Sequence, residues 1–427
     1  MSIERASVPR SSTYTDSDRA DLFEVFFDLV FVFALTRVFS HHTDLRPESL
    51  LQGVVVLALL WWAWSAFIWL GNRVRLDQGW ILGGTLIAMA ALFVAALVIP
   101  EAWASATAGS APAIALAVAF VVVRGSYLVM FLATATDDHR LRTQLLIDIA
   151  PQSLSIILLL VGAFIGGAAQ LPLWAAAFAI DFGVGRLTSR FGGWQVLNPR
   201  HFVERYSLVL LIVLGETLLS LGQGLGAMPS SAGAISAGLM GFVITTALWW
   251  SYFGSLSEAA AEVLVAAGPR RRMELARDGY VLSQFLLVVG IAFESLGIAG
   301  LTGDVISSPG EPPSVLATLG SALGAAGYLL GIVVVGRVTL GTWDTPTIVG
   351  SIAIIAIGVS GSATPAWLFI LLLCAAVVLT SVSGNIARRM ARTSANRSSD
   401  GSRAGNGRLA PNAAARRHGR CGLRSAR

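Results

Sequence analysis

The stretch LFEVFFDLVFVFALTRVFS, residues 22–40, has the length of a membrane-spanning helix and is apolar except for a few residues that include Glu24 and Asp28. A charged side chain at the centre of such a helix costs about 2.5–3.5 kcal/mol on insertion scales. The two carboxylates are four residues apart, which places both on one face of the helix. We expect this face to point into the protein. There the carboxylates either pair with arginines of other helices, Arg124 or Arg337 first of all, or line an ion or substrate path.

The composition of the whole chain supports a membrane protein. Apolar residues make up 55% of the 427 residues and charged residues 13%, whereas an ordinary soluble domain has about 45–50% and 25%. Only lipid can cover that much apolar surface. The two cysteines indicate neither a disulfide framework nor a thiolate metal site. The first 20 residues lack the pattern of a cleavable signal peptide, so we expect the first span to act as the insertion signal.

Runs of about 20 apolar residues predict an all-α, polytopic bundle of about 12 transmembrane helices. The runs are continuous rather than alternating, which favours helices over a barrel. The first six spans are expected near 22–40, 50–70, 79–99, 112–134, 144–166 and 172–189. The second six are expected near 202–224, 233–257, 279–300, 314–337, 346–362 and 364–387.

The arginines predict the orientation, because the chain contains no lysine. They concentrate in alternate connections: the second-to-third, fourth-to-fifth, sixth-to-seventh and eighth-to-ninth. The other connections lack arginine, apart from Arg46 beside Asp44 and Glu48. By the positive-inside rule, the arginine-rich connections and both termini are cytoplasmic, and the span count is even. We therefore expect a multi-pass protein of the cell inner (plasma) membrane.

The two ends of the chain are polar. Residues 1–20 form a cytoplasmic N-terminal segment, and residues 391–427 form a basic tail with almost no large apolar side chain. Such a tail is expected to be disordered. Its arginines would contact anionic lipids at about 1 kcal/mol each. Nucleic-acid binding is not expected, because no aromatic residues or folded module accompany the charge.

The two halves of the chain echo each other in the same order. Glu24 matches Glu204, LWWAW ending at Trp64 matches LWWSY ending at Tyr252, Asp77 matches Asp278, and Arg124 matches Arg337. Resemblance among apolar helices explains shared valines but not this ordered set of polar and aromatic residues. The pattern predicts two six-helix repeats, residues 21–190 and 191–390. Because six is even, the repeats run parallel and are related by an axis along the membrane normal.

Three segments resemble the bacterial low temperature requirement A family: FEVFFDLVFVFALTRVFS at 23–40, HFVERYSLVLLIVLGETLLSLG at 201–222 and LWWSYF at 248–253. The resemblance covers about residues 20–390, with Val25 where a leucine is expected. It implies a polytopic inner-membrane protein with no defined reaction, so it supplies no catalytic residues. The pattern from Glu24 to Thr36 is also similar to the first helix of a potassium-channel family of endolysosomes and bacteria. That family is built on six-helix repeats, but Leu208 replaces the second-repeat aspartate, which makes a symmetric pore doubtful.

Charged residues on several spans are the candidate functional residues. We expect a transport path or charge network formed by Glu24, Asp28, Arg124, Asp148, Asp181, Glu204, Glu216, Glu294 and Arg337. Acidic groups at staggered depth suit a path for protons, cations or a small solute, whereas mutually neutralised pairs suit a structural or stress-adaptation role.

An enzyme is not expected. The chain lacks HExxH, GxSxG, P-loop and paired-cysteine motifs. His41 and His42 have no third ligand at metal spacing, so we predict no metal, no cofactor and no catalytic residues. Trp62 and Trp69 share a helix face and either line a ligand pocket or serve packing. The glycines of GSALGAAGYLLG, residues 320–331, predict close helix packing. The expected partners are the lipid bilayer and a small ion or solute; the oligomeric state stays open.

Overall fold

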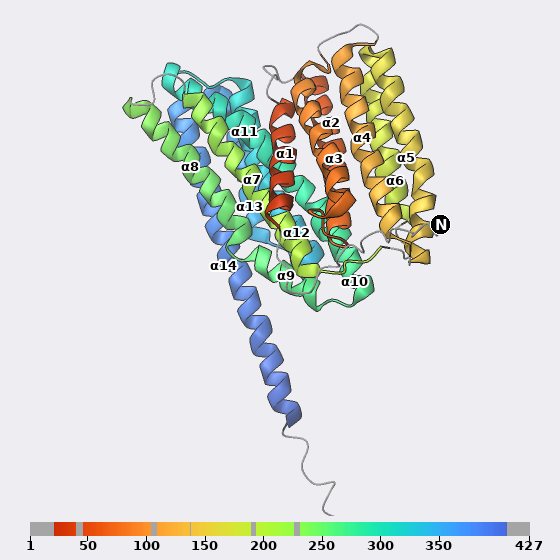
Figure 1. Ribbon diagram of the computed structural model, residues 1–427. Coiled ribbons are helices and arrows are strands. Elements are labelled where there is room, and N and C mark those ends of the chain that lie inside the picture. Colours follow the sequence, from red (N-terminus) through yellow and green to blue (C-terminus); the bar gives the residue numbers. More distant parts are fainter. Residues whose placement is uncertain are drawn as a thin grey trace, which may run out of the picture.

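The computed structural model describes residues 21–39, 46–103, 109–136, 138–188, 194–225 and 231–407, without the side chains of 395–407. The described residues form helices and no strands (Figure 1). The helices of the first half are α1 Leu22–Phe39, α2 Pro47–Gly71, α3 Gly79–Val98, α4 Ala111–Thr134, α5 His139–Ile165 and α6 Gln170–Thr188. Those of the second half are α7 Pro199–Leu225, α8 Ala232–Phe253, α9 Leu256–Ala266, α10 Pro269–Glu274, α11 Ser283–Ser307, α12 Val315–Leu340, α13 Thr345–Ser360 and α14 Ala366–Gly407.

These elements confirm the predicted polytopic bundle. Eleven helices of the described part are long and apolar enough to cross a membrane. The 18-residue α1, which carries Glu24, Asp28 and Arg37, brings the number of long helices to twelve. Each of the twelve predicted spans coincides with one of them. Eighteen residues correspond to about 27 Å of helix, close to the thickness of the hydrocarbon core.

The helix neighbours recur in the two halves. In the first half α1 packs on α3, α3 on α4, α4 on α5, α5 on α6, and α2 on α6. In the second half the corresponding pairs are α7 with α11, α11 with α12, α12 with α13, α13 with α14, and α8 with α14. The two sets contact each other where α1, the first helix of the first half, packs on α7, the first helix of the second half. This recurrence supports the prediction of two repeats.

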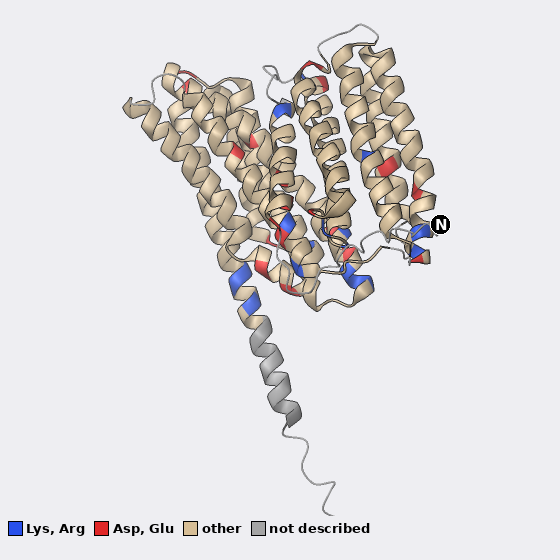
Figure 2. Cartoon of the chain, viewed as in Figure 1, with Lys and Arg blue, Asp and Glu red and all other residues tan. Residues whose placement is uncertain are grey.

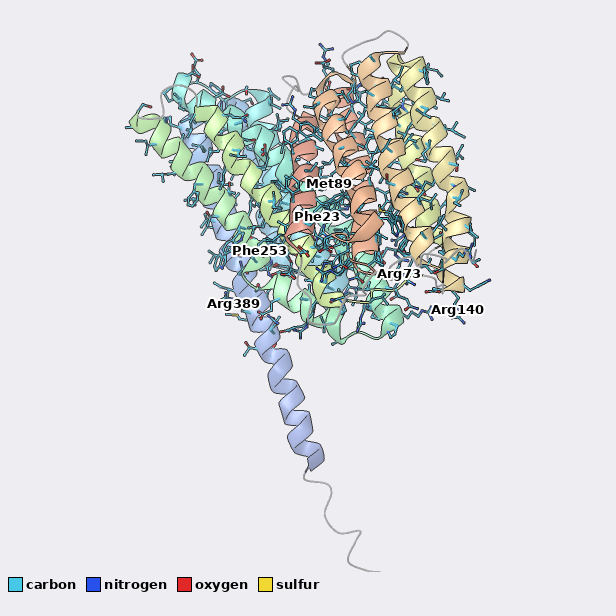
Figure 3. All side chains as sticks on the ribbon, viewed as in Figure 1. Phe23, Arg73, Met89, Arg140, Phe253 and Arg389 are labelled. Atoms are coloured by element: carbon cyan, nitrogen blue, oxygen red, sulfur yellow. The ribbon has the colours of Figure 1, made fainter. Side chains whose placement is uncertain are left out.

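Charged residues gather at one end of the bundle. The α2–α3, α4–α5 and α8–α11 connections meet there, and Arg73, Arg140 and Arg389 lie at this end (Figures 2 and 3). We call it the arginine-rich end. Helix α1 begins and α14 leaves the bundle at the same end (Figure 1), as an even number of spans requires.

Glycines allow α11 and α12 to pack closely, as the sequence predicted. A Cβ added to Gly297 would lie 1.9 Å from the backbone nitrogen of Ser321, and one added to Gly324 would lie 2.2 Å from that of Glu294. Only a residue without a side chain fits such backbone contact.

Two segments differ from the prediction. Between α8 and α11 the chain forms α9, α10 and a π-helical segment, Leu275–Leu282, before it crosses again. The tail was predicted to be disordered from residue 391, but α14 continues as helix to Gly407. The packed turns of α14 already supply the helix nucleus, so each further residue adds a backbone hydrogen bond without a new nucleation cost. Residues 1–20 and 408–427 lie outside the described residues.

Candidate functional site

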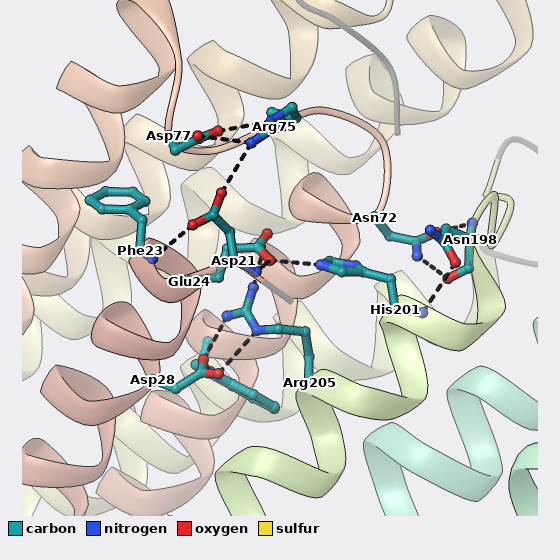
Figure 4. A network of polar contacts seen from close by, with 11 residues as sticks. Asp21, Phe23, Glu24, Asp28, Asn72, Arg75, Asp77, Asn198, His201 and Arg205 are labelled. Atoms are coloured by element: carbon teal, nitrogen blue, oxygen red, sulfur yellow. Dashed lines mark hydrogen bonds and ion pairs between the residues drawn. The ribbon is translucent and has the colours of Figure 1, made fainter. Parts of the chain in front are cut away.

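The carboxylates of α1 meet two basic residues of α7 in the interior of the bundle (Figure 4). Arg205 donates from Nε and Nη2 to the two oxygens of Asp28, at 3.0 and 2.6 Å. Its Nη1 lies 3.1 Å from Oε1 of Glu24, and Nε2 of His201 lies 2.6 Å from Oε2 of Glu24. All four side chains have no solvent exposure. They are referred to below as the buried charge network.

The expected partners of Glu24 and Asp28 were wrong. The carboxylates do face the interior, but Arg205 takes the place predicted for Arg124 or Arg337. Arg124 instead pairs with Asp181 in another part of the first half. Arg337 is exposed near the end of α12, where it donates to the carbonyl of Gly341. These ion pairs are determined by which helices pack side by side, rather than by the depth of each residue along the membrane normal.

A signal for the network was present in the sequence. Glu24 and Asp28 are four residues apart on α1, and His201 and Arg205 are four apart on α7. When two helices pack side by side, two acidic residues four apart on one helix can face two basic residues four apart on the other. His201 precedes the predicted span 202–224, a position that predicts an ordinary interfacial residue, but its side chain is completely buried.

Neighbouring residues hold the two helices in register. The indole N–H of Trp64 on α2 donates to Oδ1 of Asp28 at 2.8 Å. The side-chain oxygen of Asn72, just after α2, accepts from the backbone N–H groups of Leu197 and Asn198 before α7. The side chain of Asn198 in turn accepts from the N–H of His201. The network is therefore anchored to α2 as well as to α1 and α7.

A second set of charges lies beside the start of α1. Arg75 binds Asp21 at 3.1 Å and Asp77 at 3.1 Å (Figure 4). The hydrogen bond from Arg75 lowers the pKa of Asp77 below its ordinary value. These residues connect the α2–α3 loop to the first turn of α1.

Aromatic side chains cover the buried charge network on the side of the membrane centre. The rings of Trp61 and Trp64 lie 4.8 Å apart, and Tyr206 contacts Trp64 edge-on at 5.0 Å. Phe31 stacks on Trp64, and Phe285 packs on Trp61. These five aromatic residues come from α1, α2, α7 and α11. Together they form what we call the aromatic layer.

A cavity of about 390 Å³ follows the aromatic layer between the two halves. Its polar lining includes Glu216, Ser220 and Gln223 of α7, Ser295 of α11 and Arg37 of α1. Arg37 and Gln223 lie in the last turns of α1 and α7, so the cavity extends toward the end opposite the arginine-rich end. We call it the inter-half cavity.

A second, smaller cavity of about 90 Å³ lies among helices of the first half, and Met273, Arg277 and Val281 of the second half border it. Arg124, Asp148 and Asp181, all predicted site residues, line it together with Trp62 and Trp69. Arg124 binds Asp181 at 2.7 Å, and the indole of Trp62 donates to the same carboxylate at 3.0 Å. The structure thus brings three of the predicted residues together, but away from the network of Glu24 and Asp28.

The remaining predicted residues are apart from both cavities. Glu294 is fully buried where α11 crosses α12. Among the described residues, no side chain donates a hydrogen bond to its carboxylate. Glu204 is partly exposed on α7, and Arg337 is exposed with its guanidinium over the ring of Trp343. Within the described residues, no three His, Cys, Asp or Glu side chains are grouped to hold a metal ion.

Comparisons with known proteins agree with this architecture. Residues 19–382 match the model of the bacterial low temperature requirement A protein family. The chain is also 26% identical over 297 residues to an uncharacterized protein, RA0937, of Rhizobium meliloti strain 1021, covering 66% of this chain and 69% of that protein. No solved structure matches the chain. The family model spans most of the chain, from α1 into α14, and the protein therefore belongs to the bacterial low temperature requirement A family.

Proposed function

We propose that this protein moves a proton, a cation or a small solute across the membrane along the interface between its two halves. The observation that carries the proposal is the order of features along four helices. Three regions follow one another along α1, α2, α7 and α11, starting from the arginine-rich end. The buried charge network and its neighbours come first, the aromatic layer comes next, and the inter-half cavity comes last. A cavity that ends on a closed layer is the arrangement of a path open toward one side.

The buried charge network suits a gate at the other end of this path. Its carboxylates and its guanidinium are held by short hydrogen bonds between α1 and α7, the helices that would have to separate. Charged pairs in a dry interior have two stable arrangements, paired or separated and hydrated, with little in between. Glu216 in the inter-half cavity supplies an acidic group on the open side.

We further propose the inner membrane as the location, with the arginine-rich end in the cytoplasm. The inter-half cavity then extends toward the outside, and the network lies on the cytoplasmic side. The basic tail from residue 391, which includes Arg392, then follows the bundle on the side of the anionic cytoplasmic head groups.

Flux through purified protein in liposomes tests the proposal. A pH or potassium gradient, or a panel of labelled small solutes, should drive uptake above that of empty liposomes. Glu216→Gln and Asp28→Asn should each abolish it, because one removes the acid of the cavity and the other disturbs the gate. Glu48→Gln is the matched control, since Glu48 is exposed in the first turn of α2. All variants are first checked for folding by size-exclusion and thermal unfolding.

The second candidate is a structural protein without transport. The complete burial of the charge network favours it, because such a network also serves to fix helix register. Flux equal to that of empty liposomes for every ion and solute, with folded protein confirmed, would support this second function and contradict the first.

A further inference from the structure

The inter-half cavity is lined by one acidic and one basic side chain, Glu216 of α7 and Arg37 of α1. Helices α1 and α7 run in the same direction, because residues four apart on α1 pair in the same order with residues four apart on α7. Arg37 lies nine residues beyond Asp28 on α1, and Glu216 lies eleven residues beyond Arg205, the partner of Asp28, on α7. At about 1.5 Å per residue, these positions are about 14 and 17 Å from the buried charge network. The two charges therefore lie at similar depth in one cavity.

The carboxylate of Glu216 is not used by the protein itself. Within the described part of the chain, its side chain takes part in no salt bridge and no hydrogen bond. Ser220 and Gln223, four and seven residues later on α7, line the cavity from the same helix face. Ser220 accepts a hydrogen bond from the hydroxyl of Ser295 on α11 at 2.6 Å. This wall presents carboxylate, hydroxyl and amide oxygens, which are the acceptors that an ammonium group requires.

Arg37 places the opposite charge in the same cavity. A guanidinium carries five N–H donors in a planar fork, which matches the two oxygens of a carboxylate. A lone cation in the cavity would be repelled by Arg37, and a lone anion would be repelled by Glu216. A ligand that carries both an ammonium group and a carboxylate satisfies both residues.

The rest of the cavity wall is mostly aliphatic. Among the described residues that line it, none is aromatic. The aliphatic side chains include Val32, Leu35, Leu57, Val213, Val288 and Ile291. The volume of about 390 Å³ is more than twice the volume of about 150 Å³ that admits benzene. The cavity therefore has room for a ligand with an aliphatic body as well as two charged groups.

We propose that the inter-half cavity binds a zwitterion with an aliphatic body, an amino acid of about the size of leucine. Arg37 binds the carboxylate of the ligand, Glu216 binds its ammonium group, and the aliphatic walls enclose its side chain. This inference rests on the proposed function, because it names the small solute that the path between the two halves would carry. The cavity extends toward the end opposite the arginine-rich end, so the ligand enters from that end.

Binding is tested on the purified full-length protein in detergent, without any gradient. Tritiated leucine is titrated into the protein, and unlabelled molecules compete with it. We expect saturable binding of leucine. Isocaproate, which is leucine without its ammonium group, and isoamylamine, which is leucine without its carboxylate, should each compete about tenfold to a hundredfold more weakly. Glycine keeps both charges but lacks the aliphatic body, so it should compete about tenfold more weakly or worse.

Two variants identify the residues and the orientation of the ligand. Glu216→Gln should weaken leucine binding about tenfold to a hundredfold but should not weaken the binding of isocaproate, which has no ammonium group. Arg37→Gln should weaken leucine binding to a similar extent but should not weaken the binding of isoamylamine, which has no carboxylate. A purely structural role of either residue would not give this exchange of preferences. Glu48→Gln, on the exposed first turn of α2, should leave leucine binding unchanged.

The absence of saturable leucine binding, equal binding of leucine and either singly charged analogue, or unchanged leucine binding in Glu216→Gln would each overturn the proposal. If Arg37→Gln does not fold, Glu216→Gln and the two analogues on the unchanged protein decide. Failure of this proposal is distinguishable from failure of transport. Leucine that binds but does not enter liposomes supports the binding site and contradicts transport, whereas flux of an ion without leucine binding supports transport and contradicts the binding site.

Discussion

At the scale of residues, the buried charge network depends on Arg205. This one side chain binds both carboxylates of α1, bidentately in the case of Asp28. Two carboxylates in a dry interior would repel each other and lack solvation if the guanidinium were removed. The network therefore contributes specificity to the α1–α7 contact only while all of its members are present.

We expect Arg205→Met to destabilise the protein by about 3–5 kcal/mol, because it strands two buried carboxylates. Adding Glu24→Gln and Asp28→Asn should restore part of the loss, since the orphaned charges are then gone. Thermal unfolding in detergent and the yield of monodisperse protein measure the effect. Arg337→Met is the matched control: that arginine is exposed, and its loss should change little. A triple variant no more stable than Arg205→Met would contradict this account.

At the scale of elements, the glycines of α11 and α12 set the distance between the two helices. Membrane helices gain little from burying apolar groups against each other, so close backbone contact supplies much of their association energy. Gly290, Gly297, Gly324 and Gly331 all lie where a Cβ would meet the partner helix within 2.6 Å. Glu294 lies in the same interface, and its backbone packs on Gly324.

Gly297→Ala should therefore cost about 1–3 kcal/mol, because the new methyl group meets backbone atoms of Ser321 and Gly320 that cannot move aside. Gly300→Ala, three residues along the same helix, is the control. There the nearest atom to an added Cβ would be the Cβ of Ala317, at 3.4 Å, and the gain in helix propensity of about 1 kcal/mol should offset the contact. Denaturation in mixed detergent compares the two. Equal stabilities would show that the crossing is not as tight as the structure has it.

At the scale of the whole molecule, the charges divide the bundle into two ends. The α2–α3, α4–α5 and α8–α11 connections bring their arginines to one end, where α14 also leaves the bundle (Figures 1 and 2). Because positive charge orients insertion, we propose that this end faces the cytoplasm.

Reporter fusions test that orientation. Fusions after Gly268 and after Asp138, at the arginine-rich end, should give a cytoplasmic signal, and fusions after Gly109 and Gly310 an external one. The contrast follows from the twelve long helices and from the arginine content of the connections. An external signal from Gly268 would reverse the orientation and with it the sides assigned to the cavity and to the gate.

The sequence by itself determined the elements: the twelve spans, the bundle architecture, the grouping of arginines and the close glycine packing of α12. Each of these is a local property, because the length of an apolar run and the spacing of residues along one helix do not depend on other helices. Only the tertiary structure decided which charges meet. The opposed faces of different helices determine the contacts of Arg205 and His201, the contact between Trp62 and Asp181, and the isolation of Glu294. Apolar periodicity carries little information about which faces are opposed, because lipid and protein are equally apolar surroundings.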